Sequence, residues 1–155
     1  SSETGHLVIS TLHTNDTKQT IDRIIDSFPP EQQAQIRFQL SLFLIAVFAQ
    51  RLVKRKDGDG MVAAIEIMIN TPLIRALIAE AKTGQISKAI EDSASFYKTQ
   101  SFNQSLLSLY KDGVISVEDA LATSNNPSDL KIQIQSADFA KKSGGTNESK
   151  IGRNF

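Results

Sequence analysis

Cysteine is absent from this 155-residue chain. Its absence excludes disulfide bonds and zinc sites built on cysteine, and it is compatible with a reducing compartment. The chain also lacks an excess of one charge, because 17 basic side chains balance 17 acidic ones. A neutral balance does not indicate the basic surface that nucleic acid requires, so we expect no nucleic-acid partner.

Long hydrophobic runs are also missing, and the first residues do not have the pattern of a secretion signal. The strongest apolar run, Leu42 to Ala49, is far shorter than the roughly 20 residues that a helix needs to cross a bilayer. Residues 1–6 contain no basic region leading into an apolar core, so we do not expect them to be a signal peptide. We therefore expect no direct membrane insertion, and we interpret the apolar run as a helix that is buried or packed against another subunit.

The N-terminal part carries a short apolar stretch followed by a polar corner. Residues 7–12, Leu-Val-Ile-Ser-Thr-Leu, are apolar and partly β-branched, which predicts a buried strand. Residues 13–17, His-Thr-Asn-Asp-Thr, then precede a helical pattern. Ligands of open α/β sheets bind beyond the carboxyl ends of the strands, so His13 and Thr14 are candidate ligand contacts. From the residues alone, we favour a hydrogen-bonded loop histidine without a function over a ligand contact at His13.

A metal site built from both histidines is not expected. His6 and His13 lie at opposite ends of the apolar stretch, and an extended chain of that length separates them by roughly 23 Å. No other combination of side chains in this sequence suggests a metal site, so we predict that the chain provides no metal ligand.

The remaining pattern predicts helices around one hairpin. Turn residues at 56–60 separate predicted strands over 51–55 and 61–69. Helical patterns cover 21–28, 31–49, 73–80, 86–93 and 102–110, and a short helix begins at 116 and ends before 125. Residues 128–134 add one or two turns, and the Ser-, Gly- and Lys-rich remainder predicts a disordered tail over 135–155. The expected organisation is an α/β part over 1–72 and a helical bundle over 73–134.

Two short segments resemble a known motif. Thr4-Gly5-His6-Leu7-Val8 and Thr11-Leu12-His13-Thr14 are similar to the His box of the type II/IV secretion ATPases, and in particular of the pilus retraction motors of the PilT/PilU family. The resemblance is collinear over roughly residues 3–134, which is more specific than any single motif. It implies an α/β fold that forms the distal part of a RecA-like P-loop NTPase core, followed by a small C-terminal helical bundle.

The same resemblance implies roles for individual residues. His13 would be the catalytic histidine near the terminal phosphate of the nucleotide, and Thr11 and Thr14 would lie at the nucleotide edge. We expect His6, at the other end of the motif, to be structural and to pack or bond under the sheet. Arg23, Arg37 and Arg51 are candidates for charge contacts, and for Arg23 and Arg37 we favour a solvated helix face. In the family the arginine fingers lie largely upstream of the matching region, so none is assigned here.

Residues 73–80 resemble a second motif of the retraction motors, Ala-Ile-Arg-Asn-Leu-Ile-Arg-Glu. The residues that match are Ile74, Arg75, Leu77, Ile78 and Glu80. The resemblance implies that they couple the motor to retraction rather than to ATP hydrolysis itself. The residues alone are also compatible with an ordinary amphipathic helix whose Ile74, Leu77 and Ile78 pack into the bundle. The second arginine of the motif is Ala79 here, and other stretches (64–72, 100–106 and 118–130) resemble the PilU branch.

Two sequence elements of ATP hydrolysis are not found. The chain contains no Gly-x-x-x-x-Gly-Lys-[Ser/Thr] loop and no Walker B strand with an acidic end. We therefore expect the chain alone not to turn over ATP. Because the predicted buried strand begins almost at the first residue, we also expect the chain to be the C-terminal part of a longer protein.

The resemblance implies a hexameric ATPase that uses ATP and Mg²⁺ to drive type IV pilus retraction and twitching motility. It implies a homo-hexamer, alone or with a paralogous retraction ATPase, that works with an inner-membrane pilus platform protein at the cytoplasmic face of that membrane. The alternative is a non-catalytic interaction module that docks onto an active pilus or secretion ATPase. Assembly ATPases of the same superfamily are disfavoured, because they usually carry a four-cysteine zinc insertion.

Overall fold

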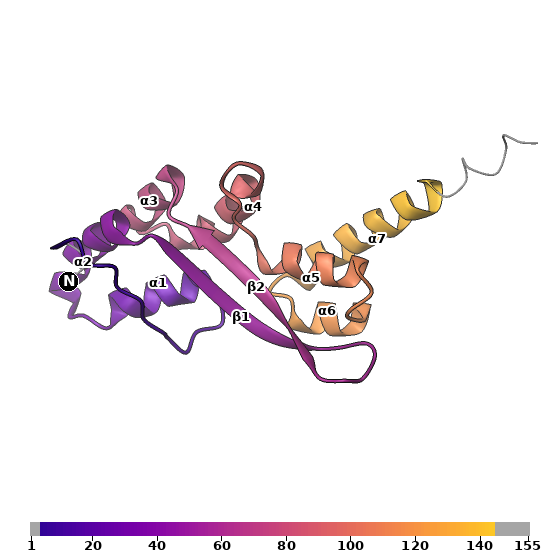
Figure 1. Ribbon diagram of the computed structural model, residues 1–155. Helices are drawn as coiled ribbons and strands as arrows, with labels where there is room; N and C mark the ends of the chain where they lie inside the picture. Colours follow the sequence, from indigo (N-terminus) through magenta and orange to yellow (C-terminus); the bar gives the residue numbers. More distant parts are fainter. Residues whose placement is uncertain (1–3, 145–155) are drawn as a thin grey trace, which may run out of the picture.

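A long two-stranded hairpin runs along a set of helices in the computed structural model, which describes residues 4–144 (Figure 1). The elements in chain order are α1 (Thr17–Asp26), α2 (Pro30–Phe43), β1 (Ala46–Lys54), β2 (Met61–Ile69), α3 (Pro72–Ala79), η2 (Thr83–Gln85), α4 (Ile86–Tyr97), α5 (Phe102–Lys111), α6 (Val117–Thr123) and α7 (Pro127–Gly144).

The helix starts follow local sequence signals. The Asp16 carboxylate accepts a hydrogen bond from the Gln19 N–H at 2.7 Å, which caps the start of α1. Thr71 caps α3 in the same way, and Pro72 takes the first helical position. Ser101 and Gln104 form a capping box at the start of α5. Each of these contacts joins residues only a few positions apart.

The hairpin has the predicted turn and return strand but a different first strand. β1 pairs antiparallel with β2, in a register that runs from Ala46 opposite Ile69 to Lys54 opposite Met61. The predicted helix over 31–49 is wrong after Phe43, where α2 ends. The Asn70 side-chain amide donates to the carbonyls of Ser41, at 2.9 Å, and Leu44, at 2.7 Å. These bonds satisfy carbonyl groups at the end of α2 and direct the following residues into the sheet.

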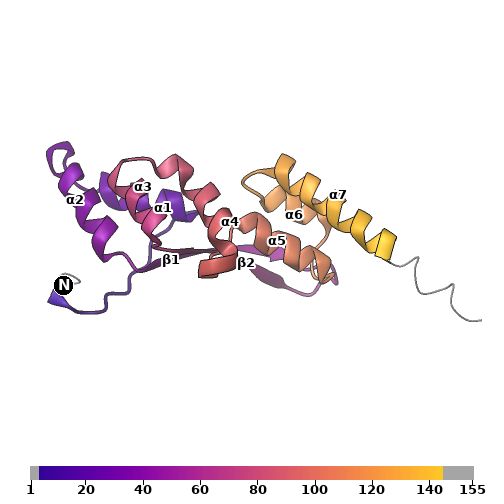
Figure 2. The same ribbon diagram turned by 90° about the horizontal axis from the view of Figure 1, so that it is seen from above.

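Buried apolar side chains form two clusters. The first joins α1, α2, α3 and α4 and includes Ile21, Ile74 and Ile90, and the second joins α5, α6 and α7 and includes Phe102 and Leu130. Figure 2 shows most of the helices along one side of the hairpin, whose inward side chains contribute to both clusters. The first cluster contains residues from both sides of position 72, because α3 and α4 pack with α1 and α2. The expected division into domains is not tested by this packing and stays a prediction.

The predicted buried strand over 7–12 is not formed. The side chains of Leu7 and Ile9 are 75% and 86% exposed, and the segment has irregular backbone. Within the described part of the chain the sheet consists of β1 and β2, and neither pairs with this segment. An apolar stretch forms a buried strand only when neighbouring strands supply hydrogen bonds and a helix layer covers its side chains.

Two predicted helix ends lie too early in the sequence. α4 continues to Tyr97, beyond the predicted end at 93. α7 continues to Gly144, so residues 135–144 are helical, and the prediction of a disordered tail is wrong for them. The Tyr110 hydroxyl donates to the Asp138 carboxylate at 3.0 Å, which connects this part of α7 to α5. The rest of the predicted tail, residues 145–155, lies outside the described residues.

Candidate functional site

The polar corner before α1, residues 13–16, is held by both main-chain and side-chain hydrogen bonds. Arg23 on α1 donates from Nη1 to the His13 carbonyl at 2.5 Å. The hydroxyl oxygens of Thr14 and Thr20 lie 2.7 Å apart. Together with the Asp16 cap, these contacts attach the corner to the first turns of α1.

Arg51 connects the corner to distant parts of the molecule. From β1, its Nε and Nη2 donate to the Asn15 carbonyl at 3.1 and 3.0 Å, and its Nη1 donates to the Thr123 carbonyl at 2.7 Å. The guanidinium carbon lies 4.6 Å from the centre of the Phe102 ring, which is a cation–π distance. Thr123 is the last residue of α6, where carbonyl groups lack a helical donor and attract a positive charge.

Glu66 supports the other end of the corner. Its side chain on β2 is only 3% exposed, and its Oε1 accepts hydrogen bonds from the Thr17 N–H at 2.9 Å and the Thr17 hydroxyl at 2.7 Å. Thr17 is the first residue of α1, so Glu66 satisfies one of the N–H groups that a helix start leaves free. Sequence reasoning missed this contact. The signal that could have found it is an acidic residue on the buried face of a strand, between the inward-facing Ala64 and Met68.

The candidate nucleotide residues lie at an open surface. The side chains of Thr11 and His13 are exposed, and that of Thr14 is half-buried. His6 is also exposed, and its Nδ1 lies 3.0 Å from the Thr4 hydroxyl. It therefore does not lie under the sheet, where it was predicted to pack or bond. The structure therefore places Thr11, His13 and Thr14 along one stretch of chain and leaves His6 apart from the hydrogen bonds that hold the corner.

The five candidate residues of α3 divide into two groups. Ile74, Leu77 and Ile78 are buried in the first cluster, as the amphipathic-helix interpretation predicts. Arg75 is exposed, and Glu80 at the C-cap forms an ion pair with Lys82 at 2.6 Å. Both partners of this pair are more than half exposed, so it adds little to stability.

The described residues provide neither a metal cluster nor a membrane helix. Among residues 4–144 no group of three or more His, Asp or Glu side chains could hold a metal ion. No helix within the same range has the length and apolar character needed to cross a bilayer. Clefts of about 570 and 450 Å³ are lined mainly by residues of α4, α5 and α7, and neither is lined by His13 or Thr14.

Comparison with known families identifies the family of this chain. Residues 1–142 match the family described as "Type II/IV secretion system protein". This chain belongs to that family. Its relatives include the type IV pilus ATPase PilU of Pseudomonas aeruginosa, 41% identical over 86% of this chain and 35% of the relative. PilT of the same organism, named as a type IV pilus retraction ATPase, is 48% identical over 76% of this chain and 34% of PilT.

Solved structures agree with the sequence relatives. The pilus retraction motor PilT with bound ADP matches with a TM-score of 0.73 and 43% identity, over 83% of this chain and 35% of PilT. The ATPase DotB of Yersinia pseudotuberculosis matches with a TM-score of 0.66 and 27% identity, over 79% of this chain and 31% of DotB. The α/β class and the resemblance to part of a RecA-like retraction ATPase are confirmed. The chain spans about a third of the length of these relatives.

Proposed function

We propose that this chain forms part of a motor that hydrolyses ATP to drive type IV pilus retraction and twitching motility. The observation that carries the proposal is the match to the PilT retraction motor, whose structure contains ADP. PilU and a "Twitching motility protein" of Neisseria gonorrhoeae, 43% identical over 80% of this chain, support the same assignment. ATP would be the substrate, with Mg²⁺ held by residues outside the set described here.

Within this motor, His13 would approach the terminal phosphate, and Thr11 and Thr14 would line the nucleotide edge. Two features support this role. The His13 carbonyl accepts a hydrogen bond from Arg23, and the neighbouring Thr14 hydroxyl lies 2.7 Å from that of Thr20. The His13 side chain is exposed and takes part in none of the hydrogen bonds described for residues 4–144. Histidine donates hydrogen bonds to a phosphate at neutral pH and can report its loss after hydrolysis.

The exposed residues of α3, Arg75 and Glu80, would couple the motor to retraction. They are available for contact with another subunit or a partner protein, whereas Ile74, Leu77 and Ile78 would act only by keeping the helix in place. The partners that fit this proposal are further copies in a hexameric ring, a paralogous retraction ATPase, and a pilus platform protein of the inner membrane. His6 would remain structural, and the motor would work on the cytoplasmic side of that membrane.

The test is steady-state ATPase activity of the full gene product that contains this chain. His13→Ala is expected to lower kcat by about 10²-fold, the usual size of a lost acid–base or phosphate contact. His6→Ala is the matched histidine variant and should lower kcat far less, because His6 contacts only Thr4 among the hydrogen bonds described. Equal, small losses in both variants would contradict the proposed role of His13.

The same preparation separates the motor from the alternative, a non-catalytic module that docks onto an active ATPase. A gene product that hydrolyses ATP by itself excludes the module. A gene product that has no activity alone, but changes the rate of a separate pilus ATPase, would replace the motor hypothesis by the module.

A further inference from the structure

Arg51 is the one side chain described here whose hydrogen bonds join the corner directly to the C-terminal helices. Its two acceptors, Asn15 and Thr123, lie 36 and 72 residues away in sequence. Both acceptors are main-chain carbonyls, so the contact controls where the backbone lies rather than which side chains meet. His13 lies two positions before Asn15, on the same irregular stretch.

The arginine side chain is suited to this arrangement. A guanidinium group is planar and carries five donors in a fixed fork, so it can hold two carbonyls in one geometry while it stacks on an aromatic ring. Phe102, the ring in question, is 1% exposed and belongs to the second cluster, so it provides a rigid support. A lysine at this position could reach one carbonyl as a point charge but could not reproduce the fork.

We propose that Arg51 is a positioning residue that fixes the His13 corner against the end of α6, so that the nucleotide edge and the C-terminal helices move together. This inference rests on the proposed function of His13. A shift of α6 would move the Thr123 carbonyl, and through the guanidinium group it would move the Asn15 carbonyl. Because such coupling is reciprocal, nucleotide at the corner would also bias the position of α6.

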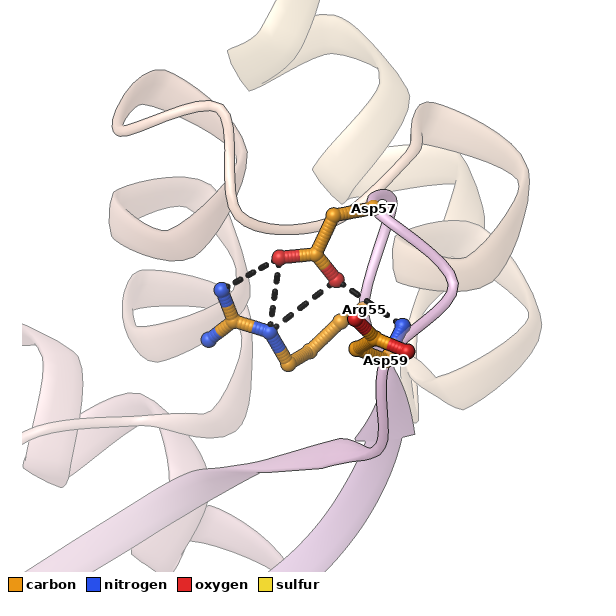
Figure 3. Close-up of polar contacts among 3 residues, drawn as sticks. All are labelled: Arg55, Asp57 and Asp59. Atoms are coloured by element: carbon orange, nitrogen blue, oxygen red, sulfur yellow. Dashed lines mark hydrogen bonds and ion pairs between the residues drawn. The ribbon is translucent and has the colours of Figure 1, made fainter.

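Arg55 provides a matched control on the same hairpin (Figure 3). Its Nη2 lies 2.6 Å from Oδ2 of Asp57, and the other oxygen of that carboxylate accepts from the Asp59 N–H at 3.1 Å. These contacts remain within the turn between β1 and β2. Arg55→Ala therefore removes an arginine of the hairpin without touching the corner or α6.

The first experiment compares Arg51→Ala, Arg51→Lys and Arg55→Ala in the full gene product by ATPase kinetics. Misplacing a catalytic group by about 1 Å can cost on the order of 10²-fold, and other contacts still hold the corner, so we expect kcat of Arg51→Ala to fall about tenfold. KM for ATP should change by less than about twofold, because the loss concerns the transition state. Arg51→Lys should recover part of the loss, and Arg55→Ala should match the unmodified protein.

The second experiment combines Arg51→Ala with His13→Ala. If Arg51 acts through His13, its loss should lower kcat little further in a protein that already lacks His13. A role in folding alone would lower kcat by the same factor in both backgrounds, and this result would overturn the inference. If His13→Ala itself has no effect, the proposed function fails, whatever Arg51 does.

Hydrogen–deuterium exchange provides a readout that does not depend on turnover. With ADP as the probe, amides of the corner and of α6 should both change their exchange rate in the unmodified protein. In Arg51→Lys, which keeps the charge and is the variant to use if the alanine variant does not fold, the α6 response should shrink at least twofold while the corner still responds. An unchanged α6 response in Arg51→Lys, with kinetics equal to those of Arg55→Ala, would refute the proposal.

Discussion

The His13 corner and helix α3 differ in what holds them in place. The corner is held by polar contacts from Arg23, Arg51 and Glu66, and the apolar side chains just before it are exposed. α3 is held by three fully or almost fully buried apolar side chains, and its polar residues point to the surface. Both regions match motifs of the retraction motors, but only three of the five matched residues of α3 are explained by packing alone.

The contrast shows why a motif match is not a list of functional residues. A motif on a helix contains the positions that pack as well as the positions that act, because both are needed for the helix to do its work. In the corner, few side chains pack, and the exposed side chain of His13 is available for contact with a ligand. Variants in α3 therefore have to be separated into those that unfold the chain and those that change its contacts.

The largest effect is expected from Ile78→Ala in α3. Ile78 is completely buried, and truncating such a side chain costs the lost burial plus the cavity left behind, about 2–5 kcal/mol of unfolding free energy. Leu73→Ala, on the same helix but 52% exposed, should cost less than about 0.5 kcal/mol. Urea unfolding followed by circular dichroism measures both. Similar costs for the two variants would remove the distinction between packed and exposed positions of α3.

A smaller loss, about 1–3 kcal/mol, is expected for Glu66→Ala, which leaves the N–H and hydroxyl of Thr17 without their buried acceptor. Glu66→Gln keeps an oxygen that can accept both bonds and should recover part of the loss. The same unfolding assay applies, and exchange of the Thr17 amide locates the effect. A stability of Glu66→Ala equal to that of the unmodified chain would mean that the corner does not depend on this buried contact.

A polar contact between Tyr110 and Asp138 also connects α5 to α7, and a titration of Tyr110 measures it. The hydrogen bond to Asp138, followed by partial burial and by the negative charges of Asp138 and Glu118, raises the pKa of Tyr110. Because folding raises this pKa, the hydrogen bond contributes fully to the unfolding free energy below the unfolded pKa of about 10. The contribution is lost as the pH rises through the folded pKa. In a Tyr97→Phe background, absorbance should show a Tyr110 midpoint above 10.

Asp138→Asn is the control for this titration and should move the Tyr110 midpoint back toward the ordinary tyrosine value. A midpoint that does not respond to Asp138→Asn would mean that α7 does not pack on α5 at this residue. The prediction of a disordered tail would then hold for residue 138.

The smallest effect is expected for Ile9→Ala, next to the corner. Ile9 is 86% exposed, so its truncation should change the unfolding free energy of this chain by less than about 0.5 kcal/mol. This variant tests directly whether the side chains before the corner are exposed. If Ile9 lay in a buried strand, the same truncation would lower the unfolding free energy severalfold more. A loss of 2 kcal/mol or more would indicate that residues 7–12 are buried in solution.

Much of the fold could be predicted because its signals are local. The caps at Asp16, Thr71 and Ser116, the glycine turn of the hairpin and the strand over 61–69 each depend on residues close together in sequence. The candidate residues His13, Thr11 and Thr14 came from a motif of adjacent residues. For α7, the helical spacing of the apolar residues Leu130 and Ile134 was the available signal, but the polar residues that follow concealed how far the helix continues.

The sequence by itself determined the family, most helix starts, the hairpin turn and the identity of the candidate nucleotide residues, since these depend on residue type and short spacing. Only the tertiary structure decided that residues 7–12 lack a strand partner, that Asn70 closes α2, and that Arg51 holds the corner against α6. The physical reason is that each of these features depends on whether hydrogen bonds form between segments far apart in sequence. Whether such a bond forms depends on how the whole chain packs.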